Sequence, residues 1–282
     1  MFSYLVIFNF LIFIFGLVIG SFLNCVIYRL ALQNFSKKNL GGREKGESFL
    51  KGRSYCPQCR HQLTWRDLIP ILGFFILKGK CRYCHQKISW QYPLVELFTA
   101  FIFLLFFIAH STNYTMVYFL LISCFLIIIF VYDLKHYIIP DKVVYPAIGI
   151  TFIYQLFRSL EFVNWSLFGI WNLEFGILKP ILSATLASVF FLLIVLVSCG
   201  KWMGIGDIKL AFLMGLILGF PNILVALFLA FFLGAIIGLG LIISGRKTLK
   251  SEIPFGPFLI TGTFIGLFCG GQIINWYLSF LI

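Results

Sequence analysis

The sequence predicts an all-α polytopic membrane protein with about eight transmembrane helices and a cytoplasmic zinc-ribbon-like loop after the first helix. Hydrophobic residues make up 61% of the 282 positions and charged residues only 11%, whereas a soluble domain carries about 25% charged residues. Apolar runs recur along the chain, and a bilayer core needs roughly 20 apolar residues per helix. Membrane lipid is therefore expected to surround most of the chain.

The first span is expected over residues 4–28, which carry no charge. No basic residue precedes this run and no small-residue cleavage site follows it, so it is expected to be a retained helix rather than a signal peptide. Gly16, Gly20 and Ser21 lie on one side at near-helical spacing, which favours close approach of a second helix. Asn24 is polar and needs a partner within the bundle.

Residues 29–92 are polar, basic and rich in glycine, and they contain two C-x-x-C pairs separated by 21 residues. The pairs are Cys56 with Cys59 and Cys81 with Cys84. This spacing is close to that of a four-thiolate zinc site, in which a closed tetrahedral shell makes the metal structural. Two disulfides or a thiol redox pair are the alternatives, and a reducing compartment would disfavour disulfides.

The other histidines and cysteines are not expected to bind the metal. His61 and His85 lie beside the cysteine pairs but are expected to be surface residues. The remaining four cysteines are scattered in apolar segments and are expected to be ordinary core residues; they are Cys25, Cys124, Cys199 and Cys269.

After residue 92 the chain returns to apolar runs separated by short polar segments. The sequence therefore divides into a first transmembrane helix at 1–28, a cysteine loop at 29–92 and a transmembrane core at 93–282. Seven further spans are expected in that core, at residues 94–109, 115–132, 143–157, 180–198, 207–220, 223–243 and 255–281.

The distribution of positive charge predicts the orientation. With the N-terminus outside, 20 of the 22 Lys and Arg residues fall on the cytoplasmic side, leaving only Arg158 and Lys179 outside. Cytoplasmic loops of membrane proteins carry such an excess. The net charge of +12 is thus explained without nucleic acid as a partner. The orientation of the later loops depends on whether the short segment 207–220 crosses the membrane.

Two aspartates are expected at the cytoplasmic face. Asp207 lies in the sequence Gly204-Ile205-Gly206-Asp207-Ile208-Lys209 at the start of one apolar run, and Asp133 ends another. Ionisable residues at membrane segments are functional candidates. Two carboxylates held close share a proton, as in aspartic proteases. Asp141 is a rival to Asp133, but it follows a proline and is expected to cap the next helix.

Several elements in order make the chain resemble the bacterial prepilin leader peptidases, a branch of the GxGD membrane aspartyl proteases. The resemblance covers most of the length, and the ordered set is far more specific than a lone G-x-G-D. Ala31 and Tyr132 are small departures from the family pattern. The matching elements are Gly20-Ser21-Phe22-Leu23-Asn24 through Arg29, the two C-x-x-C pairs, Ile69-Pro70, Pro93-Leu94-Val95-Glu96, Asp133 with Ile139-Pro140-Asp141, the segment 204–209, and Phe255-Gly256-Pro257-Phe258.

The resemblance implies a catalytic pair, Asp133 and Asp207, in a bacterial cytoplasmic membrane. Family members remove the basic leader of type IV prepilins and pseudopilins at the cytoplasmic face, after a glycine. Many then methylate the new N-terminal amine with S-adenosylmethionine, an activity linked to the cysteine loop. No residues for that cofactor can be assigned from the sequence.

Two other functional classes fit the same residues. A transporter or channel could use Asp133 and Asp207 to bind an ion or proton near its cytoplasmic mouth. A scaffold without enzymatic activity could use the zinc loop to dock a partner. Retention of cleavage by an Asp207→Asn variant would exclude the protease interpretation.

Overall fold

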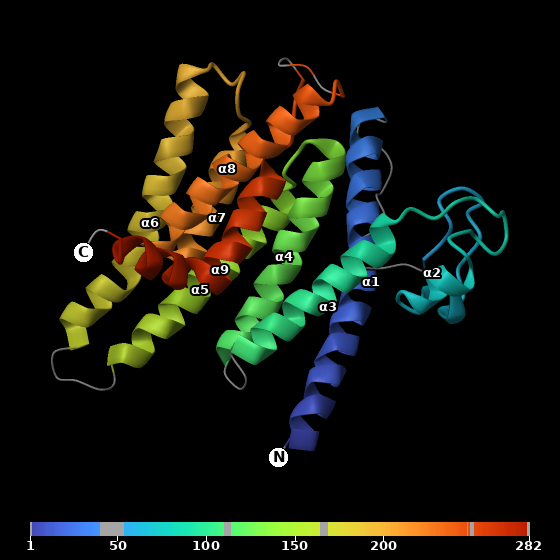
Figure 1. Ribbon diagram of the computed structural model, residues 1–282, viewed down its shortest axis with the longest axis horizontal. Coiled ribbons are helices and arrows are strands. Elements are labelled where there is room, and N and C mark those ends of the chain that lie inside the picture. The colour runs from blue at the N-terminus through green and yellow to red at the C-terminus, as the bar shows by residue number, and fades with distance from the viewer. Residues whose placement is uncertain are drawn as a thin grey trace. The chain divides into compact units, whose positions relative to one another are not determined.

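The computed structural model describes residues 2–39, 54–109, 114–163, 169–246, 248 and 251–280. The regular secondary structure within these ranges is helical, apart from two isolated β-bridges in the cysteine loop, and Figure 1 shows the order of the elements. The elements are α1 (Phe2–Asn39), the 3₁₀ helix η1 (Trp65–Leu68), α2 (Leu72–Ile76), α3 (Gln91–Ala109), α4 (Tyr114–His136), α5 (Asp141–Val163), α6 (Gly169–Val197), α7 (Ile205–Leu218), α8 (Asn222–Ile243) and α9 (Gly256–Leu278).

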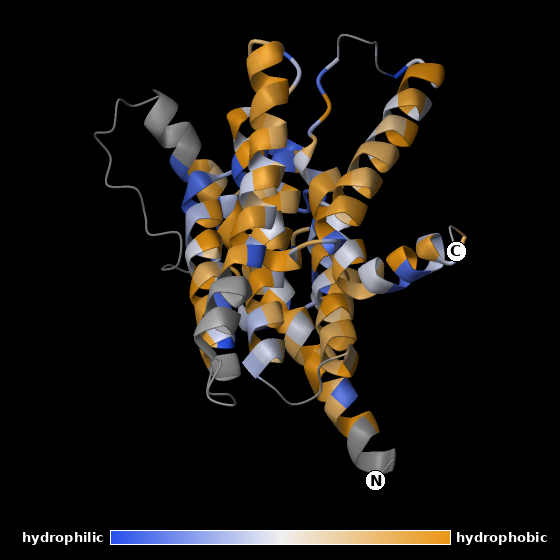
Figure 2. Cartoon of the chain, turned by 90° about the vertical axis from the view of Figure 1, so that its left-hand side faces the viewer, coloured by the Kyte–Doolittle hydropathy of each residue, from blue (hydrophilic) through white to orange (hydrophobic). Residues whose placement is uncertain are grey.

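Seven helices of the described part are long and apolar enough to cross a membrane: α1, α3, α4, α5, α6, α8 and α9. Figure 2 shows apolar residues along most of their length. The eighth predicted segment, 207–220, forms α7, which has only 14 residues. At 1.5 Å per residue this helix is about 21 Å long, shorter than the bilayer core of roughly 30 Å.

The chain forms two compact units, Met1–Ile128 and Ile129–Ile282, and the boundary falls within α4. In the first unit, α1 packs along α3. The small residues explain how closely they approach. A Cβ atom added to Gly16 would lie 2.5 Å from Cα of Ala100, and one added to Gly20 would lie 2.7 Å from Cα of Glu96. This confirms the role predicted for the small residues of the first span.

Helix α1 continues to Asn39, well past the predicted end of the first span at residue 28. Its apolar section covers Val6–Gln33. Residues 29–39 contain no glycine or proline to stop the helix, and a helix can continue into water once its apolar part has ended. The predicted division at residue 28 therefore falls inside α1.

In the second unit, α7 is the central helix and contacts α5, α6, α8 and α9. Its large side chains are almost wholly buried, including Leu210, Leu213, Met214 and Leu216. Protein rather than lipid therefore covers most of α7. A helix too short to span the bilayer can lie at membrane depth when neighbouring protein covers its ends. The burial of α7 among its neighbours therefore explains how its short length is tolerated.

Candidate active site and metal centre

Asp133 lies in the last turn of α4 and its side chain is only 4% exposed. Its Oδ2 atom accepts a hydrogen bond of 3.1 Å from the backbone N–H of Gly256, the first residue of α9. The carboxylate thus satisfies one of the N–H groups left open at a helix start. A Cβ atom at position 256 would lie 2.6 Å from this oxygen, so only glycine leaves room for Asp133.

Asp207 lies in the first turn of α7 and is 8% exposed. Its Oδ2 atom accepts a hydrogen bond of 3.2 Å from the backbone N–H of Gly204, and its own N–H donates to the Gly204 carbonyl at 3.2 Å. The carboxylate therefore caps its own helix, in the favourable orientation for negative charge near a helix N-terminus.

The two glycines before Asp207 have different surroundings. A Cβ atom on Gly206 would approach Cβ of Ile139 to 3.0 Å, so this glycine permits close packing against the α4–α5 connection. A Cβ atom on Gly204 would meet nothing closer than the Asp207 carboxylate at 3.8 Å. Only Gly204 therefore leaves open space beside the carboxylate, where a substrate backbone could approach.

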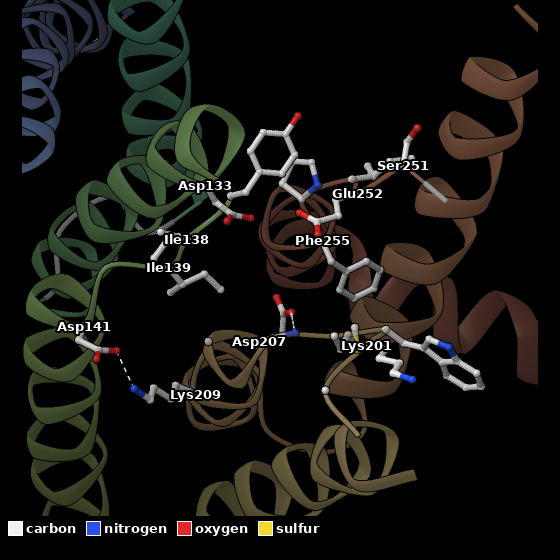
Figure 3. Close-up of a pocket in the computed structure, with 18 residues that line it drawn as sticks. Asp133, Ile138, Ile139, Asp141, Lys201, Asp207, Lys209, Ser251, Glu252 and Phe255 are labelled. Atoms are coloured by element: carbon white, nitrogen blue, oxygen red, sulfur yellow. Dashed lines mark hydrogen bonds and ion pairs between the residues drawn. The ribbon is translucent and has the colours of Figure 1, made fainter. Parts of the chain in front are cut away.

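Asp133 and Asp207 line the same cavity, which has a volume of about 920 Å³. Figure 3 shows both carboxylates facing into it. The remaining walls come from the α4–α5 connection, residues 200–204 and residues 251–255. The structure thus brings together the two aspartates that the sequence placed at one membrane face.

The same cavity fixes the direction of the short helix. The first residues of α7 and the residues leading into α9 both line it, and only α7 and α8 lie between them in the chain. Since α8 is long enough to cross a bilayer, α7 must lead away from the cavity so that α8 can return to it. The predicted topology assumes this reversal at segment 207–220, and its orientation in the membrane stays a prediction.

Asp141 is not part of the pair. It is the first residue of α5, its side chain is 58% exposed, and its Oδ1 atom forms a salt bridge of 2.6 Å with Nζ of Lys209. The Lys209 ammonium also lies 5.0 Å from the ring centroid of Tyr145. This arrangement links the starts of α5 and α7 at the rim of the cavity, in keeping with the structural role predicted for Asp141.

The four cysteines of the loop converge on one point. The sulfur atoms of Cys56, Cys59, Cys81 and Cys84 all lie within 4.8 Å of one another, and the thiols are unbridged. The sulfurs of Cys56 and Cys84 are 3.8 Å apart. Zinc–sulfur bonds of about 2.3 Å in a tetrahedron place sulfurs about 3.8 Å apart, so the cluster has the dimensions of a metal site.

Two matching turns present these sulfurs. In the first, the Cys56 N–H donates to the His61 carbonyl at 3.0 Å, and the Arg60 N–H donates to the Cys56 carbonyl at 2.9 Å. The second repeats this pattern with Cys81, Gln86 and His85 at 2.9 and 3.0 Å. The residue after each pair, Arg60 or His85, has a positive φ of 55° or 56°. The repeated geometry directs both sulfurs of each pair to one side.

The chemistry of the donors also fits a metal, because the thiolate is the form that binds. Burial opposes ionisation of Cys56, but backbone N–H groups of Cys59 and Gln58 and neighbouring thiols lower its pKa to about 7. A backbone hydrogen bond from Gln86 favours ionisation of Cys84, but burial and the other three thiols raise its pKa to about 11, so the four thiols do not ionise equally. The histidines beside the pairs are not part of the cluster. The His61 ring instead packs against Tyr83, with ring centroids 3.7 Å apart.

The first unit contains polar side chains whose partners the sequence could not identify. Asn24 donates to the Tyr92 carbonyl at 3.1 Å and accepts from the side chain of Gln91 at 3.2 Å, which confirms the expected partner in the bundle. Glu96 is 6% exposed, and its Oε2 atom accepts a hydrogen bond of 2.7 Å from the backbone N–H of Ile71. Glu96 thereby joins α3 to the start of α2 in the cysteine loop.

The prediction for the four scattered cysteines needs correction. Cys25, Cys124 and Cys269 are only half-buried, and Cys199 is exposed beyond the end of α6. Helices in a bilayer expose apolar side chains to lipid, so an apolar segment does not imply a buried residue.

Comparisons with known proteins identify the family of the chain. Residues 14–110 match the model of the bacterial peptidase A24 N-terminal domain, and residues 120–239 match that of the type IV leader peptidase family. No solved structure matches the chain.

Three curated relatives illustrate the similarity, and each is named a prepilin leader peptidase/N-methyltransferase. The protein of Aeromonas salmonicida is 31% identical over 96% of this chain and 94% of its own. That of Bacillus subtilis is 29% identical over 95% and 97%, and that of Pseudomonas aeruginosa 32% identical over 94% and 91%. The chain therefore belongs to the type IV prepilin leader peptidase/N-methyltransferase family, a family of multi-pass bacterial membrane proteins.

Proposed function

We propose that the chain is an aspartic endopeptidase that removes the leader from type IV prepilins and pseudopilins after a glycine, with Asp133 and Asp207 as its catalytic pair. The observation that carries this proposal is the convergence of two buried carboxylates on one cavity. Family membership and the full-length similarity to named prepilin peptidases support it. Two carboxylates that share one proton are the catalytic arrangement of aspartic proteases.

The two carboxylates share one proton in the reactive state, because like charges at close range cannot both ionise. The ionised member accepts a proton from water as that water attacks the scissile carbonyl. The protonated member donates a hydrogen bond to the carbonyl oxygen, where negative charge develops. The proton taken from water then passes to the departing amine. The pair thereby returns to its singly protonated state and can activate another water molecule.

The substrate backbone enters beside Gly204, where the cavity wall has no side chain. Hydrolysis in a membrane also requires water at the scissile bond, and the cavity supplies polar walls from connections that are not helical. Irregular backbone at membrane depth is tolerated where it lines such a cavity.

The second proposed activity is methylation of the new N-terminal amine, with S-adenosylmethionine as the methyl donor. The names of the relatives support this assignment. Zinc held by the four cysteine thiolates would provide a rigid core for the loop between α1 and α3. Because four thiolates would fill the ligand shell, the zinc would take no part in cleavage or methylation.

The proposed orientation places the N-terminus outside the cytoplasmic membrane and the cavity at the cytoplasmic face. The charge asymmetry supports it, with 20 of 22 Lys and Arg residues on the cytoplasmic side. The prepilin is held in the same bilayer by the hydrophobic helix that follows its leader.

Mass spectrometry of a prepilin co-expressed with the full chain tests both activities in one measurement. The wild-type chain should produce a pilin that lacks its leader and carries one added methyl group. An Asp207→Asn variant should leave the leader intact. Normal cleavage by that variant would exclude the aspartic mechanism and favour a transport or scaffold function for the carboxylates.

A further inference from the structure

The short helix α2 of the cysteine loop has an apolar side that the described part of the chain leaves exposed. Leu72, Phe75 and Ile76 are 60%, 59% and 69% exposed. Their spacing of i, i+3 and i+4 puts them on one side of the helix. Exposed apolar patches mark sites of contact with another protein or with a membrane. The exposed side of α2 therefore needs an apolar partner.

The other side of α2 is packed against the loop and the start of α3. Gly73 lies against η1, where an added Cβ atom would be 2.9 Å from the carbonyl oxygen of Asp67. The ring of Phe74 packs against that of Trp90, the residue just before α3, with ring centroids 4.9 Å apart. These contacts determine which side of α2 is packed and which side stays exposed.

A hydrogen bond to α3 sets the depth of α2 in the membrane. The Ile71 N–H, at the start of α2, donates to Glu96 Oε2 at 2.7 Å. Glu96 belongs to the candidate span Gln91–Ala109 and lies about 7–8 Å along its axis from the first residue, at 1.5 Å per residue. The headgroup layer on each side of the hydrocarbon core is about 5–8 Å thick. The start of α2 is therefore held where the hydrocarbon core meets the headgroups.

The surroundings of α2 match those of a membrane surface. Trp90 and Leu94, at the start of α3, are exposed, and tryptophan is enriched at the level of the headgroups. Residues 54–92 contain six Lys and Arg against one acidic residue, Asp67, whose carboxylate is held in a salt bridge. An apolar helix side with basic neighbours is typical of segments that lie on anionic lipid.

We propose that α2 is an interfacial membrane anchor, whose side formed by Leu72, Phe75 and Ile76 enters the headgroup region of the bilayer where α3 begins. The partner is the lipid surface itself, with anionic headgroups beside the basic residues of the loop. The cysteine loop thus lies on the membrane instead of extending freely into water. This inference does not depend on the proposed peptidase activity.

The first test replaces Phe75 of the full chain by the photoreactive analogue benzoylphenylalanine, in bacterial membranes that also contain a co-expressed prepilin. After irradiation, mass spectrometry should find lipid adducts, as it should for the same replacement of the exposed Phe101 on α3. Replacement of Phe74 should give adducts within the chain, because its ring packs against Trp90. Reaction of position 75 with the prepilin, with a second copy of the chain or with no lipid at all would overturn the proposal.

The second test measures hydrogen exchange of residues 71–77 in nanodiscs that contain anionic lipid. Phe75→Glu should accelerate exchange about tenfold, because the variant loses the burial of one large apolar side chain. Phe75→Trp should keep the wild-type rate, since tryptophan favours the interface. The zinc content of each variant reports whether the loop stays folded, and Phe75→Ser replaces Phe75→Glu if the latter loses its zinc. Exchange at the wild-type rate in the polar variant would contradict an anchor at α2.

The charge of the lipid provides the third comparison. In nanodiscs of neutral lipid, exchange of residues 71–77 in the wild-type chain should be faster than in anionic nanodiscs, by about fivefold for each basic residue at the surface. Lys78→Gln, two positions beyond α2, should reduce this difference, and so should high salt. Equal rates in neutral and anionic nanodiscs would overturn the assignment of anionic lipid as the partner.

Discussion

The cysteine cluster and the proposed catalytic pair are built in opposite ways. Cys56 and Cys84, at the two ends of the ligand set, are separated by 28 positions, and short turns bring their sulfurs together. Asp133 and the glycine that binds it are separated by 123 positions and come from different helices. The first site depends on local backbone geometry, whereas the second depends on the packing of a whole helical unit.

This difference has a practical meaning for mutations. A change in the cysteine loop should remain local, because its ligands and their turns lie in one short segment. A change that moves α4, α7 or α9 should reach the carboxylates directly, because each helix end is part of the cavity. Five predictions test this contrast, in order of decreasing effect.

The largest effect is expected from the two aspartates proposed as the catalytic pair. Asp133→Asn and Asp207→Asn should each lower the cleavage rate by at least about 10³-fold, because general acid–base groups contribute about 10² to 10⁴ and here act as one unit. The double variant should be no worse than either single variant. Quantitative mass spectrometry of prepilin provides the rates. If the double variant instead lost cleavage rate by the product of the two single losses, the two residues would act independently.

Gly256→Ala should come next, with a loss of about 100-fold in kcat/KM. Its Cβ atom would displace the Asp133 carboxylate, and misplacement of a catalytic group by about 1 Å costs a factor of this size. Gly271→Ala is the matched control, because the same helix offers open space at that position. Equal activity of the two variants would show that Asp133 tolerates displacement.

Cys56→Ser combined with Cys59→Ser should weaken zinc binding by at least about 100-fold, since two of four thiolates are lost. Metal analysis of the purified protein measures the zinc content. Methylation should decline more than cleavage, because the cavity of the second unit contains neither cysteine. Cys199→Ser is the control, since that thiol lies outside the cluster. Loss of cleavage equal to that of Asp207→Asn would contradict the separation of the sites.

Glu96→Ala should loosen the attachment of the cysteine loop to α3. It leaves the Ile71 N–H without its acceptor, and an unsatisfied buried donor costs about 1–3 kcal/mol. Hydrogen exchange of residues 69–76 should accelerate while the zinc content stays unchanged. Glu96→Gln is the conservative comparison, because its amide oxygen can still accept the bond. If hydrogen exchange of residues 69–76 were identical in the wild type and in Glu96→Ala, Glu96 would not be needed to attach the cysteine loop to α3.

The smallest effect is expected from Lys209→Met. It breaks the salt bridge with Asp141, whose carboxylate is largely exposed, and such pairs contribute about 0.2–1 kcal/mol. Cleavage should therefore change by less than about fivefold, and Asp141→Asn should behave similarly. A loss approaching that of Asp207→Asn would place Lys209 among the residues that act on the substrate.

Much of the local structure followed from the sequence. The cysteine spacing predicted a cluster that the two turns reproduce, because a C-x-x-C pair determines its own geometry within a few residues. Helix content followed from apolar runs. The small residues of the first span also predicted the close packing of α1 against α3. In each case the relevant physics acts within one helix or one turn.

The parts that depend on tertiary packing were less accessible. The sequence placed Asp133 and Asp207 at one face, but no pattern identified Gly256 as the hydrogen-bond donor to Asp133. Nothing in the sequence distinguishes the two glycines before Asp207, whereas in the structure Gly206 packs against Ile139 and Gly204 borders open space. The hydrogen bond between Glu96 and Ile71 also depends on a contact between α3 and the cysteine loop, which no local pattern shows.

The two carboxylates proposed as the catalytic pair also cap helices, and this affects how an inactive variant should be prepared. Alanine at position 133 or 207 would remove a cap together with the chemistry, and a lost cap costs about 1 kcal/mol. Asparagine removes the acid but keeps an oxygen that accepts the same N–H group. For a protein that must survive extraction into detergent, the asparagine variants are the better choice for trapping an uncleaved prepilin complex for cryo-electron microscopy.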